Sequence, residues 1–290
     1  MIPERLICSS HTISGVMPGG PDASRHGFAE RVAAASAAGY RGMCLHVRDL
    51  AAQARAGFSF ERMRDILEAH GMTEISLEFL TGWFLDGPAA APFREDEATA
   101  FTAARTLGAR SVNVGADFQN RGLRCDLMRR HFRALCDRAG EAGLAVALEF
   151  VPWSDVPDVK TALSMIDGSG NAGLVVDSWH VFRGGIPLSD LRRIPGGRIL
   201  SIQINDAAAG VCGTLAEDTL RRLPCGEGVF DLAGFLDALD AAGASVPPSV
   251  EIIAPEFAAL DLGAACARSA AGARRLLDGL VLRRARQPLE

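Results

Sequence analysis

Two stretches of sequence, LAVALEF at 144–150 and AGLVVDSWH at 172–180, indicate how this chain folds. Each contains a run of small and branched apolar residues that leads into a carboxylate, Glu149 in the first and Asp177 in the second. The apolar residues do not alternate with polar ones, which is typical of parallel strands covered on both faces. The two stretches therefore predict neighbouring buried strands with a polar site at one end of the sheet.

The same unit recurs along the whole chain, with a glycine between a segment of helical period and a short β-rich run. Glycine adopts the left-handed conformation that ends many helices at little steric cost, so each such glycine predicts a helix end followed by a strand. We expect eight strands, at 6–11, 43–47, 74–79, 111–115, 146–150, 174–178, 199–204 and 249–253.

Eight repeats of strand and helix predict an α/β protein, a (β/α)8 TIM barrel that forms a single domain over residues 1–290. The alternative is an open doubly wound sheet, which normally carries a Gly-rich phosphate-binding turn after its first strand. Here the first strand continues into His11-Thr12-Ile13-Ser14-Gly15, which lacks that motif. We also expect residues 207–230 to form a loop over the barrel mouth and residues 280–290 to form a tail.

Composition favours a small-molecule partner. Hydrophobic residues make up 48% of the chain and charged residues 22%, and the formal net charge is -5 with both signs interspersed. This balance predicts no nucleic-acid or membrane partner. The seven cysteines show no metal or disulfide spacing, and the charged start at Met1–Leu6 does not resemble a secretory signal, so we expect a cytoplasmic protein.

Four strand ends each deliver one oxygen ligand: Glu149, Asp177, Gln203 and Glu251. In a parallel barrel the carboxyl ends of all strands meet at one face, so these side chains should converge there. Three carboxylates and one amide oxygen form a hard ligand set, which suits Mn²⁺ or Mg²⁺ better than Zn²⁺. The competing interpretation for each acid taken alone is a helix cap or a pair with an arginine.

Other polar and aromatic residues follow the expected strands. His180 lies three residues after Asp177, where it could donate a proton to substrate. Arg183 follows in the same loop and could contact an anion, although a surface ion pair accounts for it equally well. We expect further substrate contacts from four residues, with loop packing as the alternative for the tryptophan: His11, His46, Glu78 and Trp153.

The strand-end pattern resembles the xylose isomerase-like barrel superfamily of sugar isomerases, epimerases and dehydratases. The residues that carry the resemblance are LEF at 148–150, VVDSWH at 175–180, IQIND at 202–206, LPCGEGVFD at 223–231 and VEI at 250–252. In that superfamily the metal is held by Glu, Asp, His and Glu, so Gln203 departs from the commoner third ligand. A glutamine there resembles the branch of 3-dehydroshikimate and inosose dehydratases. The endonuclease IV branch is disfavoured, because its zinc site is rich in histidine and this chain has six histidines in all.

The resemblance implies a metal-dependent enzyme that removes a proton next to the carbonyl of a keto-sugar or keto-polyol. Glu149 and Glu251 would then be the acid and base, and His180 would protonate a leaving hydroxyl group, giving dehydration. The alternative is a sugar or sugar-phosphate isomerase or epimerase, in which Glu149 and Glu251 exchange roles. A non-catalytic sugar- or metal-binding subunit is more distant, because a binding module does not need two opposed carboxylates. A homo-oligomer would be in keeping with the superfamily.

Overall fold

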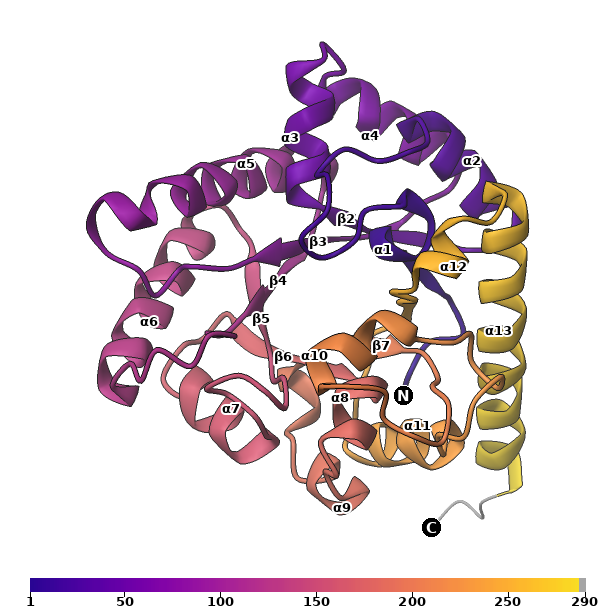
Figure 1. Cartoon of the computed structure of the whole chain (residues 1–290). Helices are drawn as coiled ribbons and strands as arrows, with labels where there is room; N and C mark the ends of the chain where they lie inside the picture. The colour runs from indigo at the N-terminus through magenta and orange to yellow at the C-terminus, as the bar shows by residue number, and fades with distance from the viewer. Residues whose placement is uncertain (287–290) are drawn as a thin grey trace.

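Eight parallel strands close into a barrel in the computed structural model, which describes residues 1–286 (Figure 1). The strands are β1 (Ile7–Ser9), β2 (Gly42–His46), β3 (Glu74–Leu80), β4 (Ser111–Gly115), β5 (Ala145–Glu149), β6 (Ala172–Asp177), β7 (Ile199–Ile204) and β8 (Pro248–Val250). Each strand pairs with the next, and β1 pairs with β8 through Ile7–Ser249 and Cys8–Val250. Closure confirms the predicted barrel and rules out the open sheet.

Helices surround the barrel and cover the outer faces of the strands (Figure 1). The larger ones are α2 (Phe28–Ala37), α3 (Val47–Arg55), α4 (Phe60–Ala69), α5 (Ala91–Leu107), α6 (Cys125–Glu141), α7 (Val159–Ile166), α11 (Leu232–Ala241) and α13 (Leu262–Arg286). Shorter ones lie in the loops between these elements: α1 (Ser10–Ser14), η1 (Gly87–Ala90), α8 (Ser178–Arg183), α9 (Leu188–Leu191), η2 (Gly196–Arg198), α10 (Leu215–Asp218), η3 (Thr219–Arg221) and α12 (Pro255–Ala258).

Local sequence accounts for where these elements begin and end. The glycines before β4 and β5, Gly108 and Gly143, have φ angles of 70° and 71°, a conformation in which a β-carbon is strained. At the other end, Asp158 caps α7 by accepting a hydrogen bond from the Thr161 amide, and Asp231 caps α11 through the Gly234 amide. The chain therefore alternates between strand and helix as predicted. The first and last strands are shorter than expected, because β1 ends at Ser9 and is followed by α1, and β8 ends at Val250.

The core occupies both sides of the barrel wall. Val146, Leu148, Leu174 and Val176 are fully buried, in line with the unbroken apolar runs of β5 and β6. Among the described residues, no helix is long and apolar enough to cross a membrane.

The C-terminal segment differs from its prediction. Residues 280–286 belong to α13 and are not a tail, whereas residues 287–290 lie outside the described part of the chain. Leu280 is buried, and Arg284 donates to Asp240 at 2.8 Å and to the Ile2 carbonyl at 3.1 Å. Arg284 thus attaches α13 to Ile2 and to Asp240 of α11.

Residues 207–230 contain more structure than the expected loop. They include α10 and η3, and residues Asp206 and Leu223 form an antiparallel bridge across the segment. Asp206 also accepts hydrogen bonds from the Gly226 and Phe230 amides. The carboxylate of Asp206 therefore stabilises the path of this segment.

Candidate active site at the strand ends

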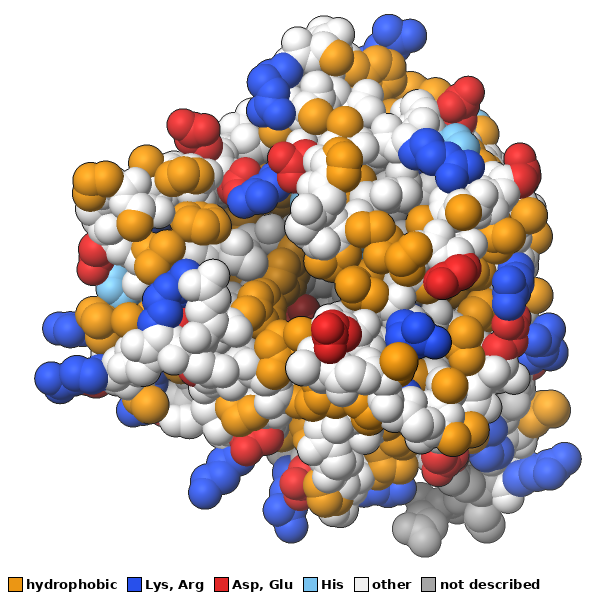
Figure 2. All heavy atoms as spheres, viewed as in Figure 1, with side chains coloured by type: hydrophobic (Ala, Val, Ile, Leu, Met, Phe, Trp, Pro, Cys, Tyr) orange, Lys and Arg blue, Asp and Glu red, His pale blue; other side chains and the backbone are white. Residues whose placement is uncertain are grey.

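The four predicted oxygen ligands lie at the carboxyl ends of consecutive strands. Glu149 ends β5, Asp177 ends β6, Gln203 lies in β7 beside Asp177 in the strand register, and Glu251 directly follows β8. All four are buried, with Asp177 only 1% exposed. The surface is hollowed at the centre of the face seen in Figure 2, and hydrophobic side chains line part of the hollow.

Arg222, which the sequence analysis did not single out, joins two of these carboxylates. Its Nη1 atom donates to Asp177 Oδ2 and to Glu251 Oε2, both at 2.7 Å, although the side chain is buried. Its Nε and Nη2 atoms donate to the Thr219 hydroxyl. Burial alone would lower the pKa of Arg222, but Asp177 and Glu251 raise it above its usual value, so the guanidinium stays charged.

Asp177 is held from two further directions. Its Oδ1 atom accepts from the Trp179 amide at 2.7 Å and from Asn205 Nδ2 at 2.9 Å. Because Oδ1 is committed to these donors, Oδ2 faces Arg222 and lies 4.0 Å from His180 Nε2. Asn205, which follows Gln203 in the sequence, is thus a positioning residue for this carboxylate.

Glu251 and Gln203 are hydrogen-bonded to each other. Gln203 Nε2 donates to Glu251 Oε1 at 2.8 Å, and the Ser9 hydroxyl lies 3.1 Å from the same oxygen. Gln203 Oε1 is buried without a hydrogen-bond partner among the described residues. Burial raises the pKa of Glu251 well above its usual range, and Arg222 only partly opposes this effect.

His180 lies between two of the acids and an aromatic wall. Its Nε2 atom is 3.2 Å from Glu149 Oε1, and its ring stands edge-on to Trp153 with centroids 5.5 Å apart. Glu149, Asp177 and His180 each offer one ligand atom, and these atoms all lie within 4.8 Å of one another. The three residues could therefore hold a metal ion together, with the unpartnered Gln203 Oε1 nearby as a further oxygen donor.

The predicted residues from β1 to β3 form a second group. Glu78 accepts from the Ser9 hydroxyl at 2.8 Å and from the Ser10 amide at 3.1 Å. Burial raises the pKa of Glu78, partly opposed by His11. The ring of His11 stands edge-on to that of His46, with centroids 5.4 Å apart. Ser9 links this group to the metal-ligand candidates, because its hydroxyl also reaches Glu251.

Burial lowers the pKa of His46 to about 3, and the neighbouring His11 lowers it further in the same direction. The imidazole of His46 is therefore neutral at physiological pH and can donate or accept a hydrogen bond without adding charge to the mouth.

Aromatic rings form a continuous wall beside His180. Phe79 stacks near Phe118 at 6.2 Å between centroids, Phe118 lies 6.4 Å from Trp153, and Trp153 stands edge-on to Trp179. Trp153 is partly exposed, and its carbonyl accepts from Asn120 in the neighbouring loop. A wall of this kind suits the apolar face of a ring-shaped or sugar-like ligand.

Arg183 lies next to this wall, but its guanidinium is hydrogen-bonded to other groups of the protein. Its Nε atom donates to Asp218 Oδ2 at 2.7 Å, and Nη2 donates to the carbonyls of Ala208 and Gly210. The structure therefore places Arg183 in a buried ion pair that holds the 208–218 segment. The ion-pair interpretation accounts for this residue, and a substrate contact would require these bonds to break.

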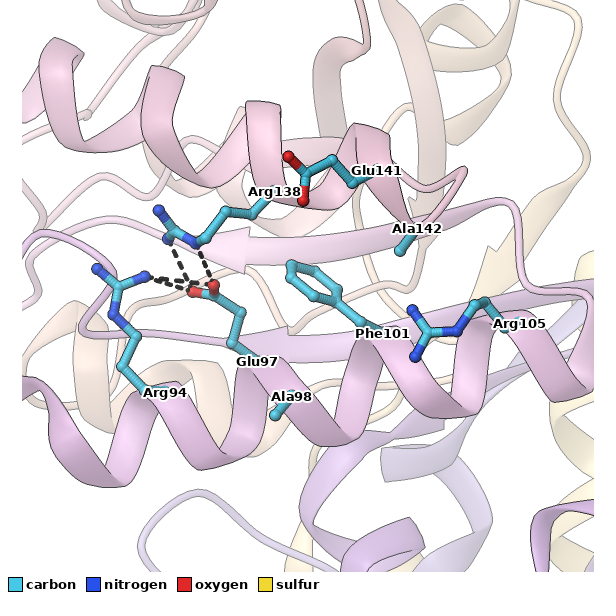
Figure 3. A pocket seen from close by; sticks show the side chains of 8 residues that line it. All are labelled: Arg94, Glu97, Ala98, Phe101, Arg105, Arg138, Glu141 and Ala142. Carbon is cyan, nitrogen blue, oxygen red and sulfur yellow. Dashed lines mark hydrogen bonds and ion pairs between the residues drawn. The ribbon is translucent and has the colours of Figure 1, made fainter.

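A separate groove lies on the outside of the barrel, between α5 and α6 (Figure 3). It has a volume of about 390 Å³, and Glu97 at its edge is paired with Arg94 and Arg138. Its lining residues come from helices and not from strand ends, so the groove is not connected with the candidate active site.

Two comparisons of sequence place the chain among known proteins. A family model described as "Xylose isomerase-like TIM barrel" matches residues 32–278. Inosose isomerase of Bacillus subtilis is 33% identical over 127 residues, which cover 42% of this chain and 45% of that protein. The 3-dehydroshikimate dehydratase of Pseudomonas aeruginosa is 32% identical over 141 residues, which cover 46% of this chain and 22% of that enzyme. The matches thus span less than half the length of these relatives.

Solved structures agree on the fold. The crystal structure described as IOLI protein with a binding zinc atom superposes with a TM-score of 0.78 at 20% identity, covering 94% of this chain and 98% of that one.

Proposed function

Since the chain belongs to the xylose isomerase-like TIM-barrel family, we propose that it is a divalent-metal-dependent enzyme that removes a proton α to the carbonyl of a keto-sugar or keto-polyol and dehydrates it. The main support for this proposal is that buried carboxylates outnumber the positively charged side chains at the strand ends. Glu149, Asp177 and Glu251 are almost completely buried, yet Arg222 is the one guanidinium among the described residues that contacts them. Buried carboxylates without compensating charge are costly, so the group is suited to a bound cation.

Glu149, Asp177, Gln203 and Glu251 are the residues that would hold this ion. Oxygen donors predominate among them, which favours Mn²⁺ or Mg²⁺, and His180 offers the nitrogen that a softer metal would prefer. A divalent ion at this place would polarise the carbonyl of the substrate and stabilise the negative charge that develops on its oxygen.

Glu251 is the proposed base. Burial raises its pKa above the usual value of a carboxyl, which makes its carboxylate a stronger base. Glu251 would take the proton from the α-carbon, and the electron pair of the broken C–H bond would form the enolate. His180 would protonate the hydroxyl on the β-carbon, which then leaves as water. His11, His46, Glu78 and Trp153 would hold the remaining hydroxyl groups and one face of the ring.

Isomerisation or epimerisation is the second candidate, and one observation favours it. Two separate carboxylates, Glu149 on β5 and Glu251 after β8, flank the centre, so one could return a proton to carbon after the other has removed it. The curated relative named inosose isomerase is in line with this possibility. Both reactions begin with removal of the same α-proton. They differ in the next step, because only dehydration requires His180 to protonate a hydroxyl group that then leaves as water.

The decisive experiment measures that shared step. Wild-type protein, Glu251→Gln and the control Glu227→Gln would be compared for metal content and for exchange of α-protons into D₂O, followed by proton NMR on a set of polyhydroxylated ketones. Glu227 is a suitable control because it pairs with Arg268 on the outside of the barrel. We expect about one Mn²⁺ or Mg²⁺ per chain and exchange in wild type and control, with both lost in Glu251→Gln. Near-normal exchange in Glu251→Gln would overturn the assignment.

A further inference from the structure

We infer that the substrate is an uncharged polyhydroxylated ketone and that carboxylated or phosphorylated ketones are excluded by charge. This inference rests on the proposed function and narrows its substrate class. The supporting observation is that the arginines at the strand ends and in the surrounding loops are paired within the protein or exposed to solvent.

The one guanidinium among the described residues at the centre is already paired with carboxyl groups. Glu149, Asp177 and Glu251 place three buried carboxyl groups there, and Arg222, the one guanidinium among the described residues that contacts them, already donates to Asp177 and Glu251. A fourth carboxyl, Glu78, is buried beside them and accepts from the Ser9 hydroxyl, which also reaches Glu251. An anionic group brought into this centre would therefore be left uncompensated in a buried place.

Several arginines in the loops that follow the strands already form ion pairs or hydrogen bonds with other groups of the protein. Arg183 pairs with Asp218, Arg121 pairs with Asp117, and Arg25 donates to the carbonyls of Ala258 and Leu260. Arg48, after β2, lies 3.0 Å from Asp96 and 3.8 Å from Asp22. Each of these side chains either forms a neutral pair or satisfies backbone carbonyls.

Lysine contributes nothing at the mouth, because the chain has a single lysine, Lys160, which is exposed in the first turn of α7. Other loop arginines are exposed, among them Arg124, which pairs with Asp126, and Arg221, which lies beside Arg222 in the sequence but outside the core. A solvent-exposed arginine is a weak anion site because water and salt screen its charge.

The hydrogen-bonding groups that do face the site suit hydroxyl groups. His46 is neutral near pH 7 because burial lowers its pKa, its ring lies 5.4 Å from that of His11, and it is paired with Glu78 in the strand register. Imidazole nitrogens and carboxyl oxygens bind hydroxyl groups without needing a charge on the ligand. The aromatic rings of Phe118 and Trp153 add an apolar wall.

The test compares ketones that differ in charge, using the 290-residue protein loaded with Mn²⁺. D-fructose would be paired with fructose 6-phosphate, and an inosose with 3-dehydroshikimate. Calorimetry gives the dissociation constants, and NMR gives the rates of α-proton exchange. We expect the uncharged member of each pair to bind and exchange about 100-fold better, as an unpaired buried charge implies. We also expect its KM to be unchanged between low and high salt.

Arg221→Ala provides the control, because Arg221 is the exposed loop cation closest in sequence to the buried guanidinium. The preference for uncharged ketones should be the same in this variant. Equal or tighter binding of the phosphate or the carboxylate, a KM that rises with salt, or an anion site lost in Arg221→Ala would each overturn the inference.

Failure of the inference is distinguishable from failure of the proposed function. If an anionic ketone exchanges its α-proton in a metal-dependent way, the proposed function stands and only the charge preference is wrong. If no ketone exchanges and Glu251→Gln retains its metal, the proposed function is wrong, and the calorimetric comparison alone decides the charge preference.

Discussion

The guanidinium of Arg222 lies 2.7 Å from the carboxylate of Asp177, and both side chains are almost completely excluded from solvent. A bond of this kind between two desolvated charges has little net effect while it is intact, but breaking it leaves a buried charge unpaired. Since Arg222 also contacts Glu251, its removal would leave two carboxylates uncompensated.

We therefore expect Arg222→Met to lower the free energy of unfolding of the metal-free protein by about 3 kcal/mol. Mn²⁺ should recover more stability in this variant than in wild type, because a divalent ion replaces the lost positive charge. Urea unfolding in chelator and in Mn²⁺ would measure both effects. Arg221→Met is the matched control and should change stability by less than about 0.5 kcal/mol. Equal losses in the two variants would contradict the expectation.

Gln203 should set the metal preference. Replacing it with histidine introduces a nitrogen donor at the position of an unpartnered amide oxygen, and nitrogen is favoured by Zn²⁺ over Mn²⁺. We expect Gln203→His to shift the ratio of Zn²⁺ to Mn²⁺ affinity by about tenfold toward zinc, a change of about 1.4 kcal/mol. Competition binding followed by metal analysis would detect it. Gln203→Ala serves as control and should weaken both metals without reversing their order.

His46 should make stability depend on pH in a defined direction. Burial lowers its pKa in the folded protein to about 3, whereas an unfolded histidine titrates near its ordinary value of about 6.5. Between these two pH values the unfolded chain binds more protons at His46 than the folded protein does. The contribution of neutral His46 to the free energy of unfolding is therefore present above the unfolded pKa and is lost as the pH falls toward the folded pKa.

The variant His46→Gln should accordingly lose less stability than wild type when the pH is lowered from 7 to 4.5. Urea unfolding at a series of pH values would show that the free energy of unfolding depends less steeply on pH in this variant. The difference should correspond to less than one bound proton, because His46 is only partly buried. His70→Gln is a suitable control, since His70 lies outside the barrel and bonds to the Ile66 carbonyl. Parallel pH profiles for wild type and His46→Gln would show that His46 is protonated in the folded state.

Arg183 and Asp218 should act as one unit. Their side chains are 7% and 3% exposed, and Asp218 also accepts from the Cys212 amide. We expect Arg183→Ala and Asp218→Ala each to increase amide hydrogen exchange at 208–214, with a coupling energy of about 1 kcal/mol or more in the double-mutant cycle. A rise in KM with Arg183→Ala alone, without any change in exchange, would instead support a substrate contact.

The barrel could be predicted from the sequence because its determinants are local. The five glycines that separate helices from strands in the sequence all have positive φ angles in the structure: Gly39, Gly71, Gly108, Gly143 and Gly243. The unbroken apolar runs of β5 and β6 identify strands covered on both faces, and the carboxylate that ends each run lies at the barrel mouth as expected. Barrel geometry then places residues that are far apart in sequence at one common face.

The contacts of Arg222 and Ser9 could not be predicted in the same way. Arg222 enters the site from a segment whose path follows from the Asp206–Leu223 bridge, and no periodic pattern encodes that path. Arg221 and Arg222 are also alike in sequence, although one is exposed and the other buried. The one available signal was the shortage of positive charge near three predicted buried carboxylates, which either a nearby arginine or a bound cation would relieve. The tail expected at 280–290 was wrong over 280–286 because Arg283 and Arg284 pair with acids on α11.

The attachment of α13 to the first residues bears on how the protein is synthesised. Thr12 donates to the carbonyl of Val250, 238 residues further along the chain, and Arg284 bonds to the carbonyl of Ile2. At ribosomal rates of about 5–20 residues per second, the N-terminal strand exists for roughly 10–50 s before these partners have been made. During that interval β1 has an unpaired edge, which is the part of a nascent β-structure most open to pairing with other chains. We therefore expect β1 to be the strand of this barrel that most needs a chaperone during translation.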